Sequence, residues 1–219
     1  MQFYHARKGI GQIFTAEILA LIAGVLALVS AVMALTAIAA SEAAASDATV
    51  GGLALGTGGI ALVASILAIV SFILTIVGIH SAGKDEETFH KAMLWLILGI
   101  VGSVLTSTGA EGSFLAMVGT LLSTLGSMLS TLYVIQGVIS LADRVGNAQV
   151  RRKGENVVKL ILAVYIIVLI LKIIDLVGAK SDFAVISGGV LGIAALVLSL
   201  VAYIIYLTLL SAGKMMLQN

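Results

Sequence analysis

The sequence predicts an all-α protein that crosses a membrane several times, and its composition provides three reasons. Hydrophobic residues make up 60% of the 219 residues, charged residues only 11%, and the mean hydropathy is +1.19. Soluble domains contain about 45–50% apolar and about 25% charged residues. The chain also lacks proline and cysteine, which favours uninterrupted helices and excludes a disulfide scaffold or a thiolate metal site. We therefore expect a polytopic membrane protein rather than a soluble enzyme or a disordered chain.

Six apolar runs approach or exceed the length of about 20 residues that spans a bilayer of about 30 Å. Backbone groups in lipid must be hydrogen-bonded within their own segment, so each run is expected to form a transmembrane helix. The first run is longer than the apolar part of a signal peptide and is therefore interpreted as a span. The runs are Phe14–Ala40, Leu53–His80, Met93–Gly109, Phe114–Ala142, Val157–Gly178 and Phe183–Ala212.

The distribution of Lys and Arg predicts the orientation of these spans. Ten of the 12 basic residues fall on one side, whereas Lys180 falls on the other and Lys172 lies within the fifth run. Cytoplasmic loops are enriched in Lys and Arg, so both termini and the loops His80–Ala92 and Asp143–Asn156 are expected in the cytoplasm. A bacterial inner (plasma) membrane is the expected location. The ten residues are Arg7, Lys8, Lys84, Lys91, Arg144, Arg151, Arg152, Lys153, Lys159 and Lys214.

The chain is expected to form one transmembrane domain, 1–219, built from three similar helical hairpins at 1–80, 81–145 and 146–219. Ser81 and Ser211 each begin a Ser-Ala-Gly-Lys segment, and Ser140 takes the equivalent place after the fourth run. A period of about one hairpin indicates an internal repeat. Basic helix ends that merely follow the charge rule are the alternative explanation.

Small residues recur at alternating spacings of four and three in four of the runs. A 3.5-residue repeat keeps one seam facing a neighbour, and small residues there let membrane helices approach closely. The fifth run is rich in Leu, Ile and Val, so we expect it to face lipid or a partner subunit. The small residues are Ala16, Ala20, Ala23, Ala27, Ser30, Ala34, Ala37 and Ser41; Ala54, Gly58, Ala61, Ser65 and Ala68; Gly112, Ala116, Gly119, Ser123, Gly126, Ser130 and Gly137; and Gly188, Gly192, Ala195, Ser199 and Ala202.

Hydroxyl side chains form a stripe along the fourth run. Such a stripe is compatible with a narrow hydrated path for ions or small polar solutes. Hydrogen bonds to backbone carbonyls or between helices are the favoured alternative, since they act as packing contacts in membranes. The residues are Thr120, Ser123, Thr124, Ser127, Ser130 and Thr131.

Two further groups of charged residues are candidate sites. Lys172 and Asp175 share a helix face near the outer end of the fifth run, where an interfacial ion pair is favoured over a proton or ion pathway. A basic cluster after the fourth run is a candidate contact for anionic lipid, or else only a topogenic signal. The acidic segment 85–87 is interpreted as a solvated loop. The basic cluster comprises Arg144, Arg151, Arg152, Lys153 and Lys159.

No catalytic motif or nucleotide-binding frame is present in the sequence. We therefore expect a non-enzymatic structural or assembly subunit that packs through its small-residue seams. Its expected partners are the lipid bilayer and either further copies of the chain or a larger membrane complex, with no cofactor, metal or nucleic acid. The alternative is a small channel or transporter for ions or small polar solutes, although proline-free helices are untypical of transporters.

Overall fold

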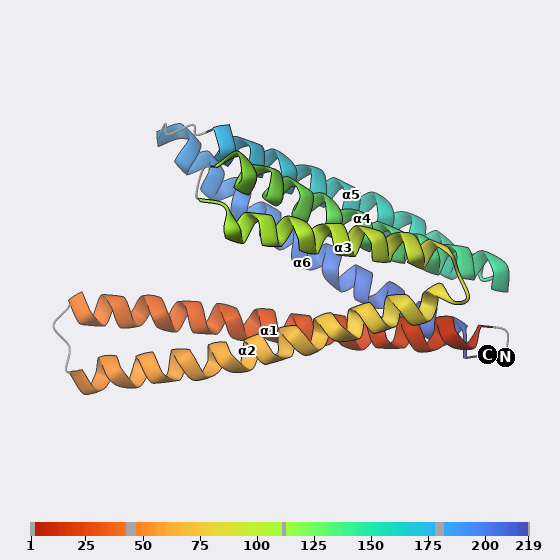
Figure 1. Cartoon of the computed structure of the whole chain (residues 1–219), viewed down its shortest axis with the longest axis horizontal. Coiled ribbons are helices and arrows are strands. Elements are labelled where there is room, and N and C mark those ends of the chain that lie inside the picture. The colour runs from red at the N-terminus through yellow and green to blue at the C-terminus, as the bar shows by residue number, and fades with distance from the viewer. Residues whose placement is uncertain (1–2, 43–46, 111–112, 178–181, 219) are drawn as a thin grey trace. The chain divides into compact units, whose positions relative to one another are not determined.

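The computed structural model is entirely helical across the residues that it describes, as predicted (Figure 1). It describes residues 3–42, 47–110, 113–177 and 182–218, and side chains within 3–39, 56–110, 113–170 and 197–218. Each helix contains one of the predicted apolar runs almost entirely. The helices are α1 (Tyr4–Glu42), α2 (Asp47–Gly83), α3 (Thr88–Thr108), α4 (Phe114–Val145), α5 (Ala148–Val177) and α6 (Asp182–Met216).

Five segments within these helices have the length and apolar composition of membrane spans. This result supports a multi-pass membrane protein. The predicted span Val157–Gly178 overlaps α5 up to Val177, but several of its side chains and Gly178 fall outside the described residues, so this sixth span stays a prediction. The five segments are Tyr4–Ala39, Gly56–Gly83, Thr88–Thr108, Phe114–Val145 and Val197–Met216.

The chain divides into two compact units, and the smaller one, Gln12–Val77, is a pair of antiparallel helices from α1 and α2. In α1, Ala16, Ala23 and Ser30 are buried at intervals of seven residues. On α2 the buried positions are Ala64 and Ser71, again seven apart. These spacings keep one face of each helix against the other. The predicted seam of α1 is therefore confirmed at these three positions.

The seam predicted on α2 does not pack against α1, and its first member, Ala54, lies outside the described side chains. Gly58, Ala61, Ser65 and Ala68 are all exposed, and a Cβ added to Gly58 would meet nothing within 4 Å. The face that packs on α1 includes Ala64 and Ser71 and lies roughly 100° around the helix from the predicted one. Both faces of α2 carry small residues at similar spacings, so the spacing alone did not distinguish them.

Two hydroxyl bonds join α1 and α2, and one of them gives a direct test of this face. The buried Ser71 donates to the Ala16 carbonyl oxygen at 2.8 Å, and Ser30 donates to that of Thr57 at 3.1 Å. We expect Ser71→Ala to lower the free energy of unfolding by about 0.6 kcal/mol, the average for interhelical bonds in membranes. Ser65→Ala is the control, because Ser65 bonds only to Ala61 in its own helix. Denaturation by SDS in mixed micelles measures both, and equal effects would contradict the assigned face.

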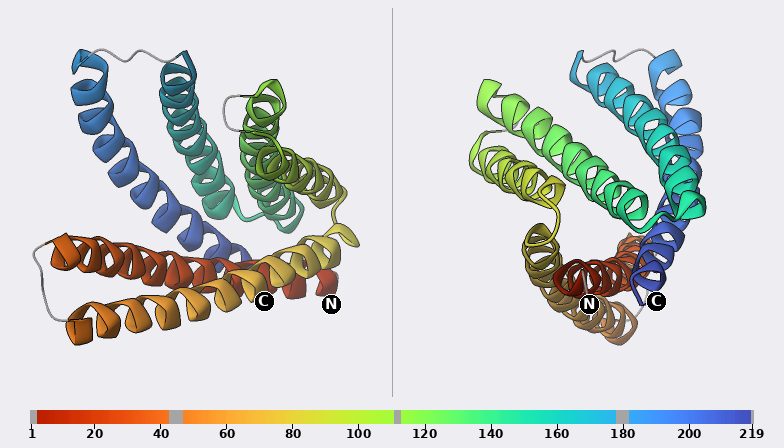
Figure 2. Two further views of the ribbon diagram at one scale, coloured as in Figure 1. Left: turned by 60° about the vertical axis from the view of Figure 1, so that its left-hand side comes forward. Right: turned by 90° about the vertical axis from the view of Figure 1, so that its right-hand side faces the viewer.

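The larger unit comprises 1–11 and 78–219. In this unit α3 packs along α4, α4 along α5, and α5 along α6. The last three helices converge at the end that holds the connection between α4 and α5 (Figure 2). The start of α1 joins the same unit, because a Cβ on Gly9 would overlap the Gly78 carbonyl oxygen and the backbone of Ala82.

The first half of α5 packs inside this unit, which corrects the expectation that the helix faces only lipid or a partner. Val150, Val157, Ile161 and Val164 are at most 8% exposed. Their spacings of seven, four and three residues form a seam of branched side chains. These four residues are not small, so the spacing of small residues in the sequence did not reveal this seam. Larger residues on other faces, such as Ile166, remain exposed.

The predicted loop Asp143–Asn156 is mostly helical. Only residues 146 and 147 separate α4 from α5. Gly146 adopts a left-handed conformation with φ 75°, which ends α4, and the Asn147 side chain accepts a hydrogen bond from the Val150 nitrogen at 3.0 Å. A glycine after one helix and an asparagine before the next are typical end signals. The helices thus extend beyond the predicted apolar runs into the charged region.

Candidate functional site

Most hydroxyl groups of the predicted stripe on α4 bond to the helix itself. Thr120 donates to Ala116, Thr124 to Thr120, Ser127 to Thr124, and Thr131 to Ser127, each through a backbone carbonyl at 2.8–3.0 Å. Such bonds satisfy the hydroxyl proton without water. This arrangement favours the packing interpretation of the stripe.

Of the remaining two stripe residues, Ser123 is half-buried and Ser130 is buried. Ser123 pairs with Ser103 of α3, with 2.9 Å between the hydroxyl oxygens, and Ser130 is 5% exposed. Part of the stripe therefore belongs to the contact between α3 and α4.

Glycines bring the backbones of α3 and α4 into contact on this same face. A Cβ on Gly126 would lie 2.5 Å from both the nitrogen and the Cα of Gly99, and one on Gly119 would lie 2.8 Å from the Gly102 carbonyl oxygen. Gly119 and Gly126 are buried members of the predicted seam. The predicted seam of α4 is therefore confirmed at Gly119, Ser123 and Gly126, where it forms a tight contact with α3, whereas Gly112 lies outside the described residues.

The candidate ion pair of Lys172 and Asp175 lies outside the described side chains. Its two residues fall within α5. Both interpretations of the pair therefore stay predictions.

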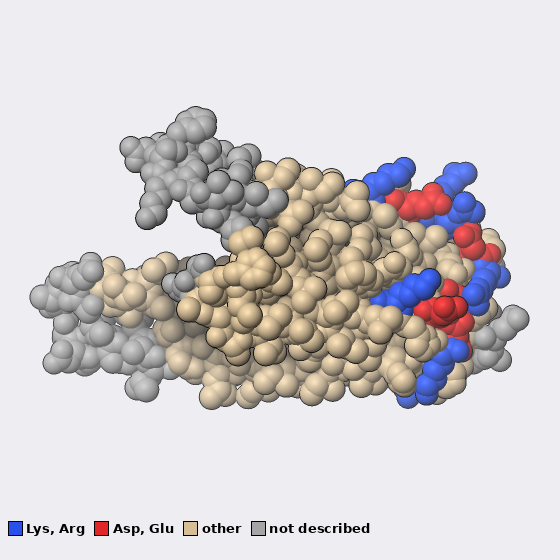
Figure 3. Space-filling view, turned by 45° about the horizontal axis from the view of Figure 1, so that its top comes forward, with Lys and Arg blue, Asp and Glu red and all other residues tan. Residues whose placement is uncertain are grey.

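Apart from Glu17 of the smaller unit, the charged side chains that the structure describes gather at one end of the larger unit (Figure 3). There, the segment between α2 and α3 contains a buried carboxylate. Arg144 Nη2 of α4 lies 2.7 Å from Glu86 Oε2, without the alignment of a hydrogen bond, and Thr88 donates to Glu86 Oε1 at 2.6 Å. The Glu86 side chain is 5% exposed and that of Arg144 is 51% exposed. The interpretation of 85–87 as a solvated loop was therefore wrong for Glu86.

Asp85, the neighbouring acid, holds the start of α1. Its Oδ2 accepts a hydrogen bond of 2.7 Å from the Ala6 nitrogen. A carboxylate at this place binds an N–H group that has no partner within the helix and also suits the helix dipole. Ser81 donates to the His5 carbonyl oxygen at 3.2 Å nearby. The segment between α2 and α3 thus connects α1 to α4, and no recognisable signal in its sequence indicates this role.

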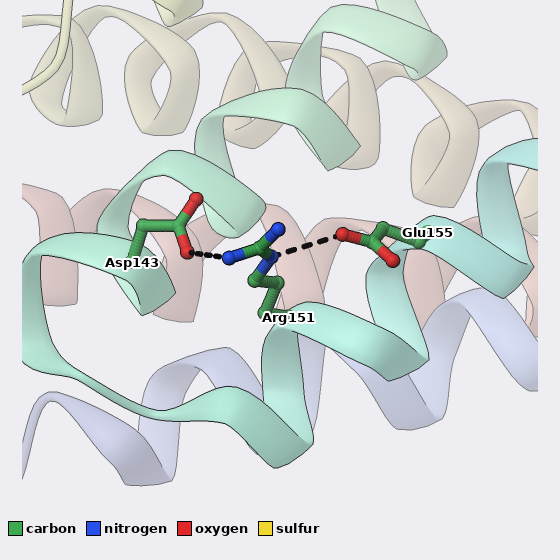
Figure 4. Close-up of polar contacts among 3 residues, drawn as sticks. All are labelled: Asp143, Arg151 and Glu155. Atoms are coloured by element: carbon green, nitrogen blue, oxygen red, sulfur yellow. Dashed lines mark hydrogen bonds and ion pairs between the residues drawn. The ribbon is translucent and has the colours of Figure 1, made fainter.

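Arg151, at the start of α5, binds two carboxylates (Figure 4). Its Nε lies 2.9 Å from Glu155 Oε1, and its Nη1 lies 3.1 Å from Asp143 Oδ1. The hydrogen bond to Glu155, followed by the charge of Asp143, raises the pKa of Arg151 above its ordinary value. This guanidinium is therefore already partnered by protein carboxylates.

The basic cluster predicted to contact anionic lipid separates into two groups. Arg144 and Arg151 form ion pairs with protein carboxylates, whereas Arg152, Lys153 and Lys159 form none within the described part of the chain. Lys153 donates instead to the Thr208 carbonyl oxygen of α6 at 3.3 Å. The charge left for an external anion therefore lies on the second group.

Within the described residues, no group of three or more His, Cys, Asp or Glu could hold a metal ion. No family model matches the chain, and no similar curated protein or solved structure was found. The protein class therefore rests on the molecule itself: the described residues form helices and no strands, and five helical segments among them have the length and composition of membrane spans.

Proposed function

We propose that this chain is a non-enzymatic structural or assembly subunit of a membrane, and that it associates with further copies through α2. The main support is the exposed face of Gly58, Ala61, Ser65 and Ala68. Lipid and leucine are equally apolar, so helices in membranes associate where small residues permit close backbone contact. This face has that composition and is not used in the contact of α2 with α1.

The packing of α3 on α4 supports the same reading, because the chain already uses small residues in this way. Glycines and serines there bring two backbones into direct contact. The alternative function, a small channel or transporter, has less support. A hydrated path needs hydroxyl groups available to solutes, whereas the stripe on α4 donates to backbone carbonyls or faces α3.

The proposal includes an orientation with the charged end in the cytoplasm, in a bacterial inner membrane, with both termini on that side. The excess of Lys and Arg at this end supports it. We also propose that the three hairpins are repeats. Ser81 and Ser140 follow residues that are buried at the same spacing in α2 and α4. The two residues after each serine are buried in the same way. The buried residues are Gly78, Ile79, Ala82 and Gly83 around Ser81, and Gly137, Val138, Leu141 and Ala142 around Ser140.

The double variant Ala61→Leu, Ser65→Leu tests self-association. We expect the wild-type protein to form oligomers in lipid vesicles, and the variant to associate at least about tenfold more weakly, because leucine holds the backbones apart. Single-molecule photobleaching of the full chain measures the copies per cluster over a range of lipid-to-protein ratios. Val63→Leu is the matched control, since Val63 is exposed on the opposite side of α2.

A wild-type protein that stays monomeric at every ratio would contradict the proposal and indicate that this face is covered within the chain. Oligomers that the double variant leaves intact would exclude this face. Solute flux through vesicles that Ser127→Leu abolishes would favour the channel instead.

A further inference from the structure

A groove of about 330 Å³ lies between the first turns of α5 and the last turns of α6. One wall carries three polar side chains: Asn147, which directly precedes α5, and Gln149 and Lys153 in the first turns of α5. The α6 side consists of Ala212, Met215 and Met216. One wall therefore offers hydrogen-bond donors and a positive charge, and the other offers a flexible apolar surface.

Lys153 is the charged group of this groove, and no carboxylate among the described side chains forms an ion pair with it. Its Nζ donates to the Thr208 carbonyl oxygen, but an ammonium group has three donors, and a carbonyl carries no charge. The carboxylates of Asp143 and Glu155 both bind Arg151, which leaves them engaged elsewhere. The groove therefore favours a ligand that carries negative charge.

The groove also lies at the level where lipid headgroups are expected. The segment of α6 that has the length and apolar composition of a span is Val197–Met216, so Met215 and Met216 lie at its end. The apolar run of α5 begins at Val157, one turn beyond Lys153. A lysine at such a boundary keeps its stem in the apolar layer and its ammonium among the headgroups. A ligand in this groove would therefore contact both water and the hydrocarbon layer.

We propose that this groove binds the headgroup of an anionic glycerophospholipid. Lys153 contacts the phosphate, the side-chain amides of Asn147 and Gln149 donate to headgroup oxygens, and the first part of an acyl chain lies on Met215 and Met216. Within the basic cluster that was predicted to contact anionic lipid, the proposal assigns the binding to Lys153 and this groove. It does not depend on self-association through α2.

Lys153→Gln tests the site in the full-length protein. We expect native mass spectrometry with phosphatidylglycerol in detergent to show about fivefold weaker retention of the lipid. This is the loss expected when one cation is removed from the headgroup level. Lys91→Gln, which removes an exposed charge on α3, is the matched control and should retain the lipid like wild type. Phosphatidylcholine should bind all three proteins equally, and Lys153→Arg should restore binding of phosphatidylglycerol.

Equal losses for Lys153→Gln and Lys91→Gln would overturn the proposal, because they would show attraction by general charge. Inorganic phosphate that displaces the lipid at matched concentration would also overturn it, because the site would then bind a free anion. Circular dichroism and size-exclusion chromatography identify a variant that has lost its fold. If Lys153→Gln is such a variant, unchanged retention by Gln149→Ala would contradict the site.

Discussion

Gly126→Ala is expected to force α3 and α4 apart and to lower the free energy of unfolding by about 2–3 kcal/mol. The new Cβ would lie 2.5 Å from Gly99 backbone atoms and 2.8 Å from the Trp95 carbonyl oxygen. Overpacking in a tight core costs about 1–3 kcal/mol. The upper part of this range applies because all three neighbouring atoms belong to a backbone and cannot rotate away.

Gly99→Ala is a demanding control, since it adds the same methyl group to the same helix contact. Its Cβ would lie 3.5 Å from the nearest atoms of Gly126 and Ser127, which is an ordinary van der Waals distance. We expect less than about 1 kcal/mol of destabilisation. Denaturation in SDS mixed micelles, followed by the fluorescence of the single tryptophan, Trp95, measures both variants. Equal losses would show that the backbones do not meet as described.

The difference between these two glycines illustrates what the sequence could predict. Hydropathy and the lack of proline were enough to locate the helices, because backbone hydrogen bonding in lipid leaves few alternatives. The periodicity of Gly119, Ser123 and Gly126 also identified the contact face of α4. It did not reveal which partner residue each glycine meets, since that depends on the axial shift between α3 and α4.

The faces of α2 and α5 show where periodicity was insufficient. On α2, two neighbouring faces carry small residues, and only the position of α1 selects the one with Ala64 and Ser71. On α5, branched residues such as Val157 and Ile161 pack by filling space rather than by close backbone approach. A seam can therefore form without small residues, and the spacing of small residues does not reveal such a seam.

The charged end was the least predictable part of the molecule. Asp85 and Glu86 lie in a segment rich in charge, and in sequence nothing distinguishes them from the exposed Glu87. Their roles follow from tertiary neighbours 58 residues or more away, namely Arg144 and Ala6. Contacts of this kind decide which cations remain available, and so they also determine the candidate lipid site.

Arg144→Gln is expected to destabilise the protein by about 2–3 kcal/mol, because it leaves the Glu86 carboxylate buried without a cation. Removing one partner of a fully buried ion pair costs about 3–5 kcal/mol. The side chain of Arg144 is 51% exposed, so solvent already weakens this pair and the lower estimate applies. Arg144 also donates to the Asp85 carbonyl oxygen at 3.4 Å, so its loss loosens the segment between α2 and α3.

Two companion variants separate this pair from a general effect of charge. Arg152→Gln removes an exposed cation near the same end and should change the free energy of unfolding by less than about 0.5 kcal/mol. Adding Glu86→Gln to Arg144→Gln should restore much of the lost stability, because an amide is far less costly to bury than an unpaired carboxylate. The SDS titration gives the coupling energy from the double-mutant cycle. Losses that simply add would mean that Glu86 does not depend on Arg144, and that other contacts hold this end of the protein together.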